Sequence, residues 1–324
     1  MSTVTGFTLQ QLIAFLKKEQ IAHNITTSNS HPGDCVFALA SLHHKTKNGI
    51  YFISGNHDEV ISGISDSIVL TNQASGIAST NIIIVVENPQ LVHYKLSAGL
   101  EKKAVPLIHP TAIIDPEAVI STSAHIGPYC ILGKCIIDDG VVLMGTITVN
   151  DGTVIKKNTV IESHTVIGAR GMAWIWDDEG NRVMQSQSGG VIIEEDCVIG
   201  TGIAIVRGSL SENTVIGKGT VMAHGTKIGH GCKIGAQTHF ANNVSLAGNA
   251  IIGERVFLGS GCVISSNVII GEGCIVGAGA VVHKSIPDTY CTIAGVPAVI
   301  IKRNNFDSKP KGAPKPFYKK NKDE

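Results

Sequence analysis

Large apolar residues recur at every sixth position through much of the chain. The position two before each of them carries a smaller side chain, from Thr214 to Ala280. The large residues are Ile216, Met222, Ile228, Ile234, Phe240, Leu246, Ile252, Leu258, Ile264, Ile270, Val276 and Val282. A period of six fits neither a helix nor simple strand alternation, and it is typical of a parallel β-helix. We predict a triangular coil in which each hexad forms a strand and a corner, and residue i stacks on residue i+18 at roughly 4.8 Å.

The same repeat begins near Pro106, and it is interrupted at three places. Its large residues there are Ile108, Ile114, Ile120, Ile126 and Leu132, then Ile137, Leu143, Val149, Ile155, Ile161 and Ile167 after a one-residue deletion, and finally Ile193, Ile199 and Ile205. We expect all of them to point inward. The repeat stops over residues 168–190, and a second slip, one residue short, lies around Arg207 to Ser211. Because a long excursion adds nothing to a solenoid core, the segment at 168–190 is predicted to be functional rather than a tolerated surface insertion.

Residues 1–104 lack the hexad and predict a separate α/β domain. Thr8 precedes an apolar face formed by Leu9, Leu12, Ile13 and Leu16, and this arrangement predicts a capped helix. Short β-rich runs follow at 49–54, 67–71 and 81–86, and the segment 90–100 is helical in pattern. The coil domain is then placed at 105–290, with a cap and basic tail at 291–324. The tail from Asn304 onward has little to bury, and we expect it to be mobile or loosely docked.

Charge and cysteine content exclude several classes of function. Lys plus Arg and Asp plus Glu both number 26, so no net field favours nucleic acid or an anionic membrane. The sequence has neither a secretory leader pattern nor a long apolar span, and we expect a cytoplasmic protein without stable membrane insertion. The cysteines lack C-x-x-C pairs, so no metal site is predicted. Six of them take the small position of the hexad, where packing explains them: Cys130, Cys135, Cys197, Cys232, Cys262 and Cys274.

Histidines on the coil are the first candidates for chemistry near neutral pH. His224 and His230 each follow a repeat aliphatic by two residues, His239 precedes Phe240, and His164 lies just before the excursion. A coil of this kind encloses no cavity, so a ligand is expected on its outside or between neighbouring coils. A surface role without chemistry is the alternative for each histidine, and we expect it for two of the four.

The hexads resemble those of the hexapeptide-repeat acyltransferases, whose coil is left-handed. From Phe7 to about Ser285 the chain is similar to the N-acyltransferase family of lipid A synthesis, which acylates UDP-3-O-acylglucosamine. The similarity includes the segment 88–94, the excursion at 168–190 and the tract Arg207-Gly208-Ser209-Leu210. In that family the base is the histidine of an Ile-Ala-His-Asn tract, which here is Ile228-Gly229-His230-Gly231. The resemblance implies that His230 is the base and that the N–H of Gly248 contacts the oxyanion.

The repeat alone also predicts that Gly248 lies close to His230. Gly248 follows His230 by three hexads and is therefore expected one rung further on the same face. A glycine there lets a thioester carbonyl approach the backbone N–H, which suits an oxyanion contact.

Two departures from that family concern substrate contacts. The position of its second active-site histidine is Asn267 here. The aromatic residue that stacks on uracil matches Phe52, but the polar residues that follow it in the family align with Gly55 and Asp58. Either a different base is bound, or Asn56 and His57 provide a different contact to it. Phe52 as an ordinary core residue is the alternative.

A third departure lies at the C-terminal end, where residues 293–303 are similar to hexapeptide acetyltransferases that use coenzyme A. That resemblance implies that Gly277 and the basic pair Lys302 and Arg303 lie near the cofactor, with the charges facing its phosphates. A solvated basic end is the alternative.

Together these residues predict a mainly β protein, a left-handed parallel β-helix with a small N-terminal α/β domain that binds a nucleotide. The predicted function is N-acyl transfer from acyl-CoA to a nucleotide-linked amino (deoxy) sugar of bacterial surface polysaccharide, in a homotrimer. The predicted site is His230 and Gly248 for catalysis, Phe52, Asn56, Asn267, His239 and Trp174 for the substrate, and Gly277, Lys302 and Arg303 for the cofactor. The alternatives are a lipid A N-acyltransferase that uses acyl carrier protein, a non-catalytic nucleotide-sugar-binding trimer and an O-acyltransferase. The sugar, the nucleotide base and the acyl length are left open.

Overall fold

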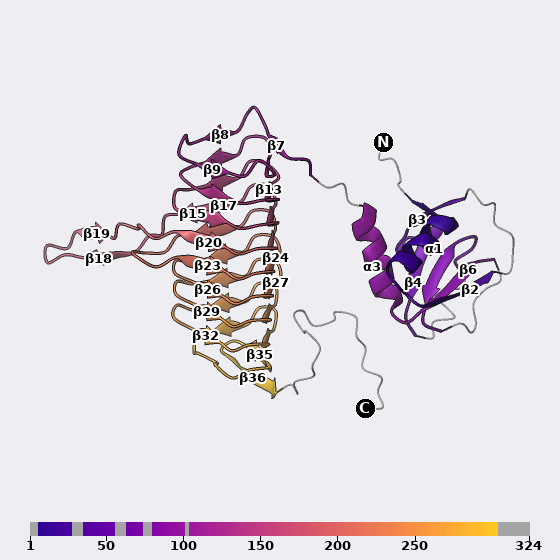
Figure 1. Ribbon diagram of the computed structural model, residues 1–324. Coiled ribbons are helices and arrows are strands. Elements are labelled where there is room, and N and C mark those ends of the chain that lie inside the picture. Colours follow the sequence, from indigo (N-terminus) through magenta and orange to yellow (C-terminus); the bar gives the residue numbers. More distant parts are fainter. Residues whose placement is uncertain (1–5, 28–34, 56–62, 74–79, 101–103, 304–324) are drawn as a thin grey trace. The chain divides into compact units, whose positions relative to one another are not determined.

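The computed structural model describes residues 6–27, 35–55, 63–73, 80–100 and 104–303, and the expected tail from Asn304 lies outside them (Figure 1). The chain forms two compact units, residues 1–103 and residues 104–324. No described helix is long and apolar enough to cross a membrane. Each unit is described by itself.

The N-terminal unit is a mixed sheet with helices. The described elements are β1 (Phe7–Thr8), α1 (Leu9–Lys18), β2 (His23–Thr27), β3 (Val36–Leu39), β4 (Gly49–Ile53), β5 (Ile68–Thr71), β6 (Ile82–Val86) and α3 (Pro89–Leu100). The strand order is β1-β3-β4-β5-β6-β2, and the four central strands are parallel. Both predicted helices and the three predicted strands are confirmed, and Thr8 forms a capping box with Gln11. The sequence analysis missed β1, β2 and β3, of which β2 and β3 carry no run of alternating apolar residues.

The second unit is the predicted left-handed parallel β-helix, built from three sheets. The first sheet contains β7 (Leu107–Ile108), β10 (His125–Ile126), β13 (Val142–Leu143), β16 (Val160–Ile161), β21 (Val198–Ile199), β24 (Val221–Met222), β27 (His239–Phe240), β30 (Phe257–Leu258), β33 (Ile275–Val276), β35 (Cys291–Gly295) and β36 (Ala298–Arg303). The second sheet contains β8 (Ile113–Ile114), β11 (Ile131–Leu132), β14 (Thr148–Val149), β17 (Val166–Ala169), β22 (Ala204–Val206), β25 (Lys227–Ile228), β28 (Ser245–Leu246), β31 (Val263–Ile264) and β34 (Val281–Val282). The third sheet contains β9 (Val119–Ile120), β12 (Ile136–Ile137), β15 (Thr153–Ile155), β20 (Val191–Ile193), β23 (Thr214–Ile216), β26 (Lys233–Ile234), β29 (Ile251–Ile252) and β32 (Ile269–Ile270).

The hexad residues fill the interior as the pattern predicts. From Ile216 to Val282 every large hexad residue is buried, and so is the smaller residue two before it. Full burial of such an aliphatic side chain stabilises the fold by about 1.5–3 kcal/mol. Most of the buried threonines in the coil hydrogen bond to the backbone: Thr238 Oγ1, for example, donates to the carbonyl of Gly253 at 3.1 Å. Thr153 is the exception, because its buried Oγ1 has no partner among the described residues.

The first rung is an exception to the expectation that every hexad residue points into a closed interior. Ile108 is 52% exposed, whereas Ile126, which pairs with it one rung later, is fully buried. No described rung precedes β7, so nothing in the coil covers the end of the interior column there.

The buried cysteines allow a direct test of the packing. Burial raises the pKa of Cys232 to about 11 and that of Cys262 to about 12. At pH 8 a thiol with a pKa of 11 is a thiolate about once in a thousand molecules, and the reagent also cannot reach it. We expect iodoacetamide to modify the half-exposed Cys35 first in the native protein, and all eight cysteines after unfolding in urea, as read by mass spectrometry. Rapid native labelling of Cys232 or Cys262 would contradict this packing.

Candidate active site

The three interruptions of the hexad all fall at one corner of the coil, where the chain passes from the second sheet to the third. Ile120 pairs with Ile137, a step one residue shorter than an ordinary rung of three hexads. Ile155 pairs with Ile193, more than two ordinary rungs further along the chain, because the excursion at 168–190 is inserted there. We call this edge, which carries residues 133–135, 170–190, 207–213, 229–231, 247–249, 265–267 and 283–285, the insertion corner.

The second slip is not a one-residue deletion, as the sequence analysis expected, but an insertion. β23 follows β22 directly, and Ile193 pairs with Ile216, a longer step than an ordinary rung. Five extra residues therefore lie at the insertion corner. The hexad pattern allows two interpretations of this segment: a single step to the next strand with five extra residues, or two steps with an additional strand between them and one residue missing. Both place Ile216 eleven residues after Ile205, so the sequence alone does not distinguish them.

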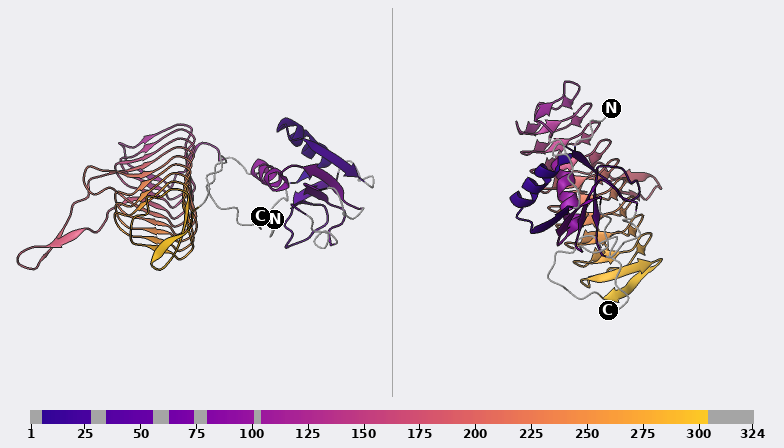
Figure 2. Two further views of the ribbon diagram at one scale, coloured as in Figure 1. Left: turned by 90° about the horizontal axis from the view of Figure 1, so that it is seen from below. Right: turned by 90° about the vertical axis from the view of Figure 1, so that its right-hand side faces the viewer.

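The excursion is a β-hairpin that projects from the coil (Figures 1 and 2). Its strands are β18 (Trp174–Trp176) and β19 (Arg182–Met184), paired antiparallel. The guanidinium of Arg182 lies 4.7 Å from the ring centre of Trp174 and 5.5 Å from that of Trp176, close enough for cation–π contact. Ile175 on the opposite face is 69% exposed, so the hairpin presents apolar side chains on both faces.

The hairpin base is tied to the inserted residues 207–213. The guanidinium of Arg207 donates to the carbonyls of Gly168 at 3.2 Å and Gln187 at 3.5 Å, and also to that of Asp151. Ser188 adds a hydrogen bond from its N–H to the Ser209 carbonyl at 3.0 Å. These hydrogen bonds therefore connect the base of the β-hairpin to residues 207–213, the loop beside His230.

His230 lies at the insertion corner with its ring against the backbone of Gly248. A Cβ atom at position 248 would collide with Nε2 and Cε1 of His230, so only glycine leaves room for the ring. Among the described residues the N–H of Gly248 donates to no other group. The other ring nitrogen, Nδ1, lies 2.9 Å from the hydroxyl of Ser209. The half-buried imidazole thus has Nδ1 held by the loop and its Nε2 side packed against the backbone of Gly248.

Asn267 and Trp174 share this corner with His230. The N–H of Asn267 donates to the carbonyl of Gly248 at 3.0 Å, and the residue is exposed. Trp174 is on the hairpin, which leaves the corner two turns of the coil before His230. The structure therefore brings His230, Gly248 and Asn267 together. The hairpin that carries Trp174 projects from the same edge of the coil.

The other predicted residues of the coil lie elsewhere. His239 is on the outer face of the first sheet, where its ring stacks on Phe257 at 5.2 Å and 15°, and burial lowers its pKa. Gly277 lies at the corner between the first and second sheets, next to Ala294. On β36, Lys302 is exposed, while Arg303 pairs with Asp288 at 2.7 Å.

The other two candidate histidines, His224 and His164, lie outside the insertion corner. His224 Nδ1 accepts a hydrogen bond from the N–H of Thr201 at 3.0 Å, and His164 is an exposed corner residue with φ of +64°. Both lie between the first and second sheets. Among the described residues, no group of three or more His, Cys, Asp or Glu side chains is arranged to hold a metal ion.

In the N-terminal unit, Phe52 is half-buried and lies in an aromatic cluster. Its ring is 5.1 Å from that of His93 and 6.3 Å from that of Tyr94, both on α3. Burial lowers the pKa of His93, whose Nε2 is 3.0 Å from the carbonyl of Ile50. Asn56 and His57 lie outside the described residues.

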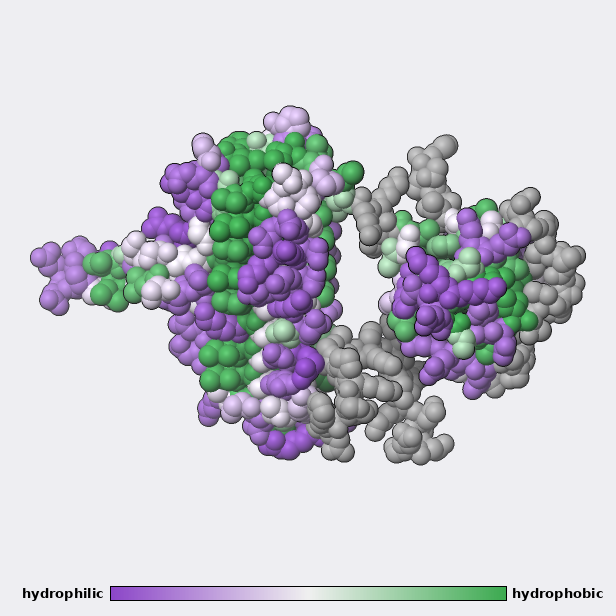
Figure 3. Space-filling model, in the orientation of Figure 1, coloured by the Kyte–Doolittle hydropathy of each residue, from purple (hydrophilic) through white to green (hydrophobic). Residues whose placement is uncertain are grey.

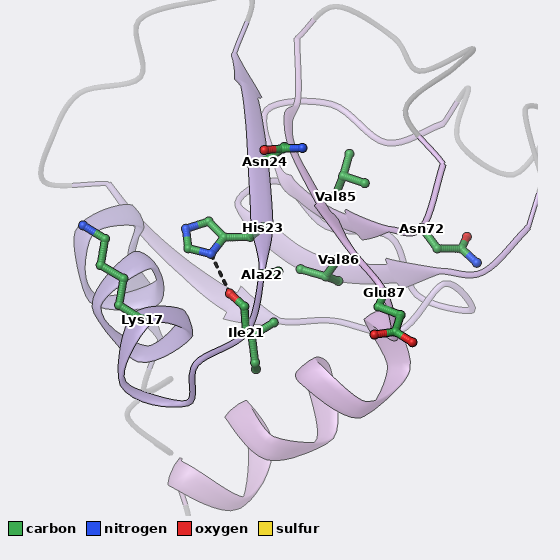
Figure 4. Close-up of a pocket in the computed structure, with 9 residues that line it drawn as sticks. All are labelled: Lys17, Ile21, Ala22, His23, Asn24, Asn72, Val85, Val86 and Glu87. Carbon is green, nitrogen blue, oxygen red and sulfur yellow. Dashed lines mark hydrogen bonds between the residues drawn. The ribbon is translucent and has the colours of Figure 1, made fainter.

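An open pocket of about 580 Å³ lies in the same unit, and Phe52 is not part of its lining (Figure 4). Lys17 at the end of α1 and Glu87 after β6 give its lining one charge of each sign. The amides of Asn24 and Asn72 also line it. The sequence analysis did not anticipate this pocket, which forms only when the α1–β2 turn meets the ends of β5 and β6.

The sequence analysis also missed Ser209 and Glu212. Glu212 accepts hydrogen bonds from the N–H groups of Ser209 at 2.7 Å and Leu210 at 3.2 Å. The available signal was the slip at 207–211, which marks an insertion on the same edge as His230.

Comparison with known proteins agrees with the β-helix fold. The family described as "Bacterial transferase hexapeptide (six repeats)" matches residues 249–284, and "Hexapeptide repeat of succinyl-transferase" matches residues 180–207 and 211–236. The UDP-3-O-acylglucosamine N-acyltransferase of Coxiella burnetii (strain Dugway 5J108-111) is 26% identical over 223 residues, which cover 62% of this chain and 65% of that relative. The match therefore spans less than two thirds of the relative's length.

Two solved structures are similar to the coil. LpxA from Acinetobacter baumannii superimposes with a TM-score of 0.54 at 30% identity, covering 60% of this chain and 72% of that one. UDP-N-acetylglucosamine acyltransferase from Campylobacter jejuni gives 0.54 at 25% identity, covering 62% and 78%. The fold is that of a hexapeptide-repeat β-helix. The chain is similar to acyltransferases of that class, among them the lipid A enzymes.

Proposed function

We propose that this protein transfers an acyl group from acyl-CoA to the amino group of a nucleotide-linked amino (deoxy) sugar used for bacterial surface polysaccharide. The observation that carries the proposal is the packing of the His230 ring against Gly248, whose N–H donates to no other group among the described residues. A base and an oxyanion donor that face one space are what acyl transfer requires.

In the proposed reaction the amine attacks the thioester carbonyl and a C–N bond forms. Nε2 of His230 accepts the proton that the amine loses, and the Gly248 N–H donates to the oxyanion. When the tetrahedral intermediate collapses, the C–S bond breaks. The leaving thiolate takes the proton from the imidazolium, and His230 returns to its neutral form.

For the acceptor, we propose that the N-terminal unit binds the nucleotide, with Phe52 as the stacking surface. The exposed ring of Tyr94, beside Phe52, supports this role because it extends the aromatic surface. Asn56, Asn267, His239 and Trp174 are the further proposed contacts to the substrate.

For the donor, we propose Gly277, Lys302 and Arg303 as contacts to coenzyme A. Lys302 makes no ion pair with a described residue, so its charge is available to a phosphate. The pairing of Arg303 with Asp288 weakens the case for Arg303, because a phosphate would have to compete with that carboxylate.

We propose a homotrimer with the donor groove between subunits, in the cytoplasm where acyl-CoA and nucleotide sugars are made. An apolar stripe along the outer face of the third sheet supports subunit packing (Figure 3). It includes Val119, Ile136, Ile251 and Ile269, each between 40% and 62% exposed. Lys233 interrupts the stripe.

A donor and acceptor panel tests the proposal. The purified protein is incubated with acetyl-CoA, longer acyl-CoAs or acylated carrier protein, together with UDP- or dTDP-linked amino sugars. We expect thiol release only when CoA donor and amine acceptor are both present, and a product that resists hydroxylamine because it is an amide. A hydroxylamine-labile product would show transfer to a hydroxyl group. Nucleotide-dependent thermal stabilisation without turnover would favour the non-catalytic binding trimer; a ligand at 100 times its Kd stabilises by about 2.7 kcal/mol.

The second candidate is a lipid A N-acyltransferase that uses acyl carrier protein. The observation that favours it is the similarity to UDP-3-O-acylglucosamine N-acyltransferase from Coxiella burnetii. In the same panel this candidate predicts product only with acylated carrier protein and a UDP-3-O-acylglucosamine acceptor.

A further inference from the structure

Two lysines interrupt the outer faces of the second and third sheets, and both lie next to His230 in the chain. Among the described strands, the outward residues that pair from rung to rung carry one charge on each of these sheets. On the second sheet they are Ile113, Ile131, Thr148, Val166, Ala204, Lys227, Ser245, Val263 and Val281. On the third sheet they are Val119, Ile136, Val154, Ile192, Val215, Lys233, Ile251 and Ile269. Both lysines are exposed, so the interior of the coil requires neither of them.

The two lysines differ in their partners. Nζ of Lys233 donates to the carbonyl of Asn213 at 2.7 Å and so holds the end of the inserted loop. Lys227 makes no ion pair or side-chain hydrogen bond with a described residue. Its neighbours in the sheet, Ala204 and Ser245, are small and uncharged. The structure of the single chain therefore gives Lys233 a role and leaves the ammonium of Lys227 without one.

Lys227 is close enough to His230 to contact the same ligand. Three residues separate them, so their Cα atoms are at most about 10 Å apart. Ser245, beside Lys227 in the sheet, begins the strand that leads directly to Gly248. A ligand with its reacting amine at His230 that extends over Ser245 is thus within reach of the flexible lysine side chain.

An exposed ammonium group without a counter-charge is suited to a phosphate. Of the two proposed substrates, the acceptor brings a phosphate nearer to the reacting atoms, because the sugar ring that carries the amine is itself linked to the diphosphate. In acyl-CoA the whole pantetheine arm separates the thioester from the nearest phosphate. An extended donor therefore places its diphosphate far from a lysine that is three residues from the base.

We propose that Lys227 binds the diphosphate of the nucleotide-linked acceptor and so selects nucleotide-linked amino sugars over free ones. This inference rests on the proposed function. Lys227 is a binding residue and takes no part in proton transfer, which belongs to His230.

The binding test compares nucleotides with their nucleosides on the full-length protein. Isothermal titration gives the Kd of UDP and of uridine, and of dTDP and thymidine, for the wild type and for Lys227→Met. We expect the preference for the diphosphate over its nucleoside to fall about 10-fold in Lys227→Met, the effect of losing one hydrogen bond to a charged group. Lys227→Arg keeps the positive charge, and we expect it to retain most of the preference.

The kinetic test separates the acceptor from the donor. In Lys227→Met we expect KM for the nucleotide-linked amino sugar to rise about 10-fold, with kcat and KM for acyl-CoA unchanged. Lys157→Met is the matched control, because Lys157 is an exposed coil lysine at the corner between the third and first sheets. We expect wild-type affinities, kinetic constants and melting temperature from it.

Three outcomes would overturn the inference. A rise in KM for acyl-CoA alone would assign Lys227 to the donor, and an altered oligomeric state with unchanged nucleotide affinity would assign it to a contact between copies. A wild type that binds UDP and dTDP no better than their nucleosides would have no such phosphate site. If the wild type transfers no acyl group, the proposed function fails, and the titrations still decide whether Lys227 binds a diphosphate.

Discussion

Replacing His230 with alanine is expected to lower the rate of acyl transfer about 10²- to 10⁴-fold, the usual contribution of a positioned general base. The imidazole is half-buried at the insertion corner, and its contacts are to Ser209 and Gly248, so its loss leaves the hexad interior intact. Product formation is followed by thiol release at saturating donor, and circular dichroism confirms that the coil is folded.

His164→Asn serves as the control for losing a coil histidine. His164 is exposed at a different corner with φ of +64°, a conformation that asparagine tolerates well. We expect wild-type rates from this variant. An unchanged rate in His230→Ala would remove His230 as the base, and proton loss assisted by the substrate would become the better account.

Gly248→Ala is expected to lower kcat about 10²- to 10³-fold, a loss comparable to that of one oxyanion donor. The new methyl group would occupy the space of the His230 ring, so the imidazole must move away from the reacting carbonyl. The same methyl group would also obstruct the approach of a thioester to the N–H at position 248.

The double variant His230→Ala, Gly248→Ala separates these two effects. If the methyl group acts only by displacing the imidazole, the double variant is as active as His230→Ala alone, because residues that act as a unit are not additive. A further loss in the double variant would assign a separate role to the Gly248 N–H. Wild-type activity in Gly248→Ala would contradict the site described here.

The interior of the coil was readable from the sequence because each hexad repeats one environment. Ile216 and Val282 are eleven hexads apart, yet both are fully buried, and the interior position was assigned without any knowledge of the third dimension. The open first rung was not readable in this way. Ile108 obeys the same pattern and is exposed, because the pattern does not say where the stack ends.

The family resemblance identified His230 and Gly248 as site residues, and their spacing of one rung placed them on the same face. In the structure the two residues are in contact. The geometry at the second irregularity was beyond such reasoning. A step of eleven residues has two interpretations along the chain, and only the pairing of Ile193 with Ile216 shows that five residues are inserted. Ser209 and Glu212, which lie in that insertion, therefore could not be connected with His230.

The sequence by itself determined the coil and its interior, because these depend on a local period that every rung repeats. The choice of His230 as the proposed base came from the family resemblance. Only the tertiary structure decided that the deletion, the hairpin and the inserted loop share one edge with His230, because that edge is assembled from segments separated by whole turns of the coil. The same reason explains why His239 and Gly277, plausible along the chain, lie on other sides of the coil.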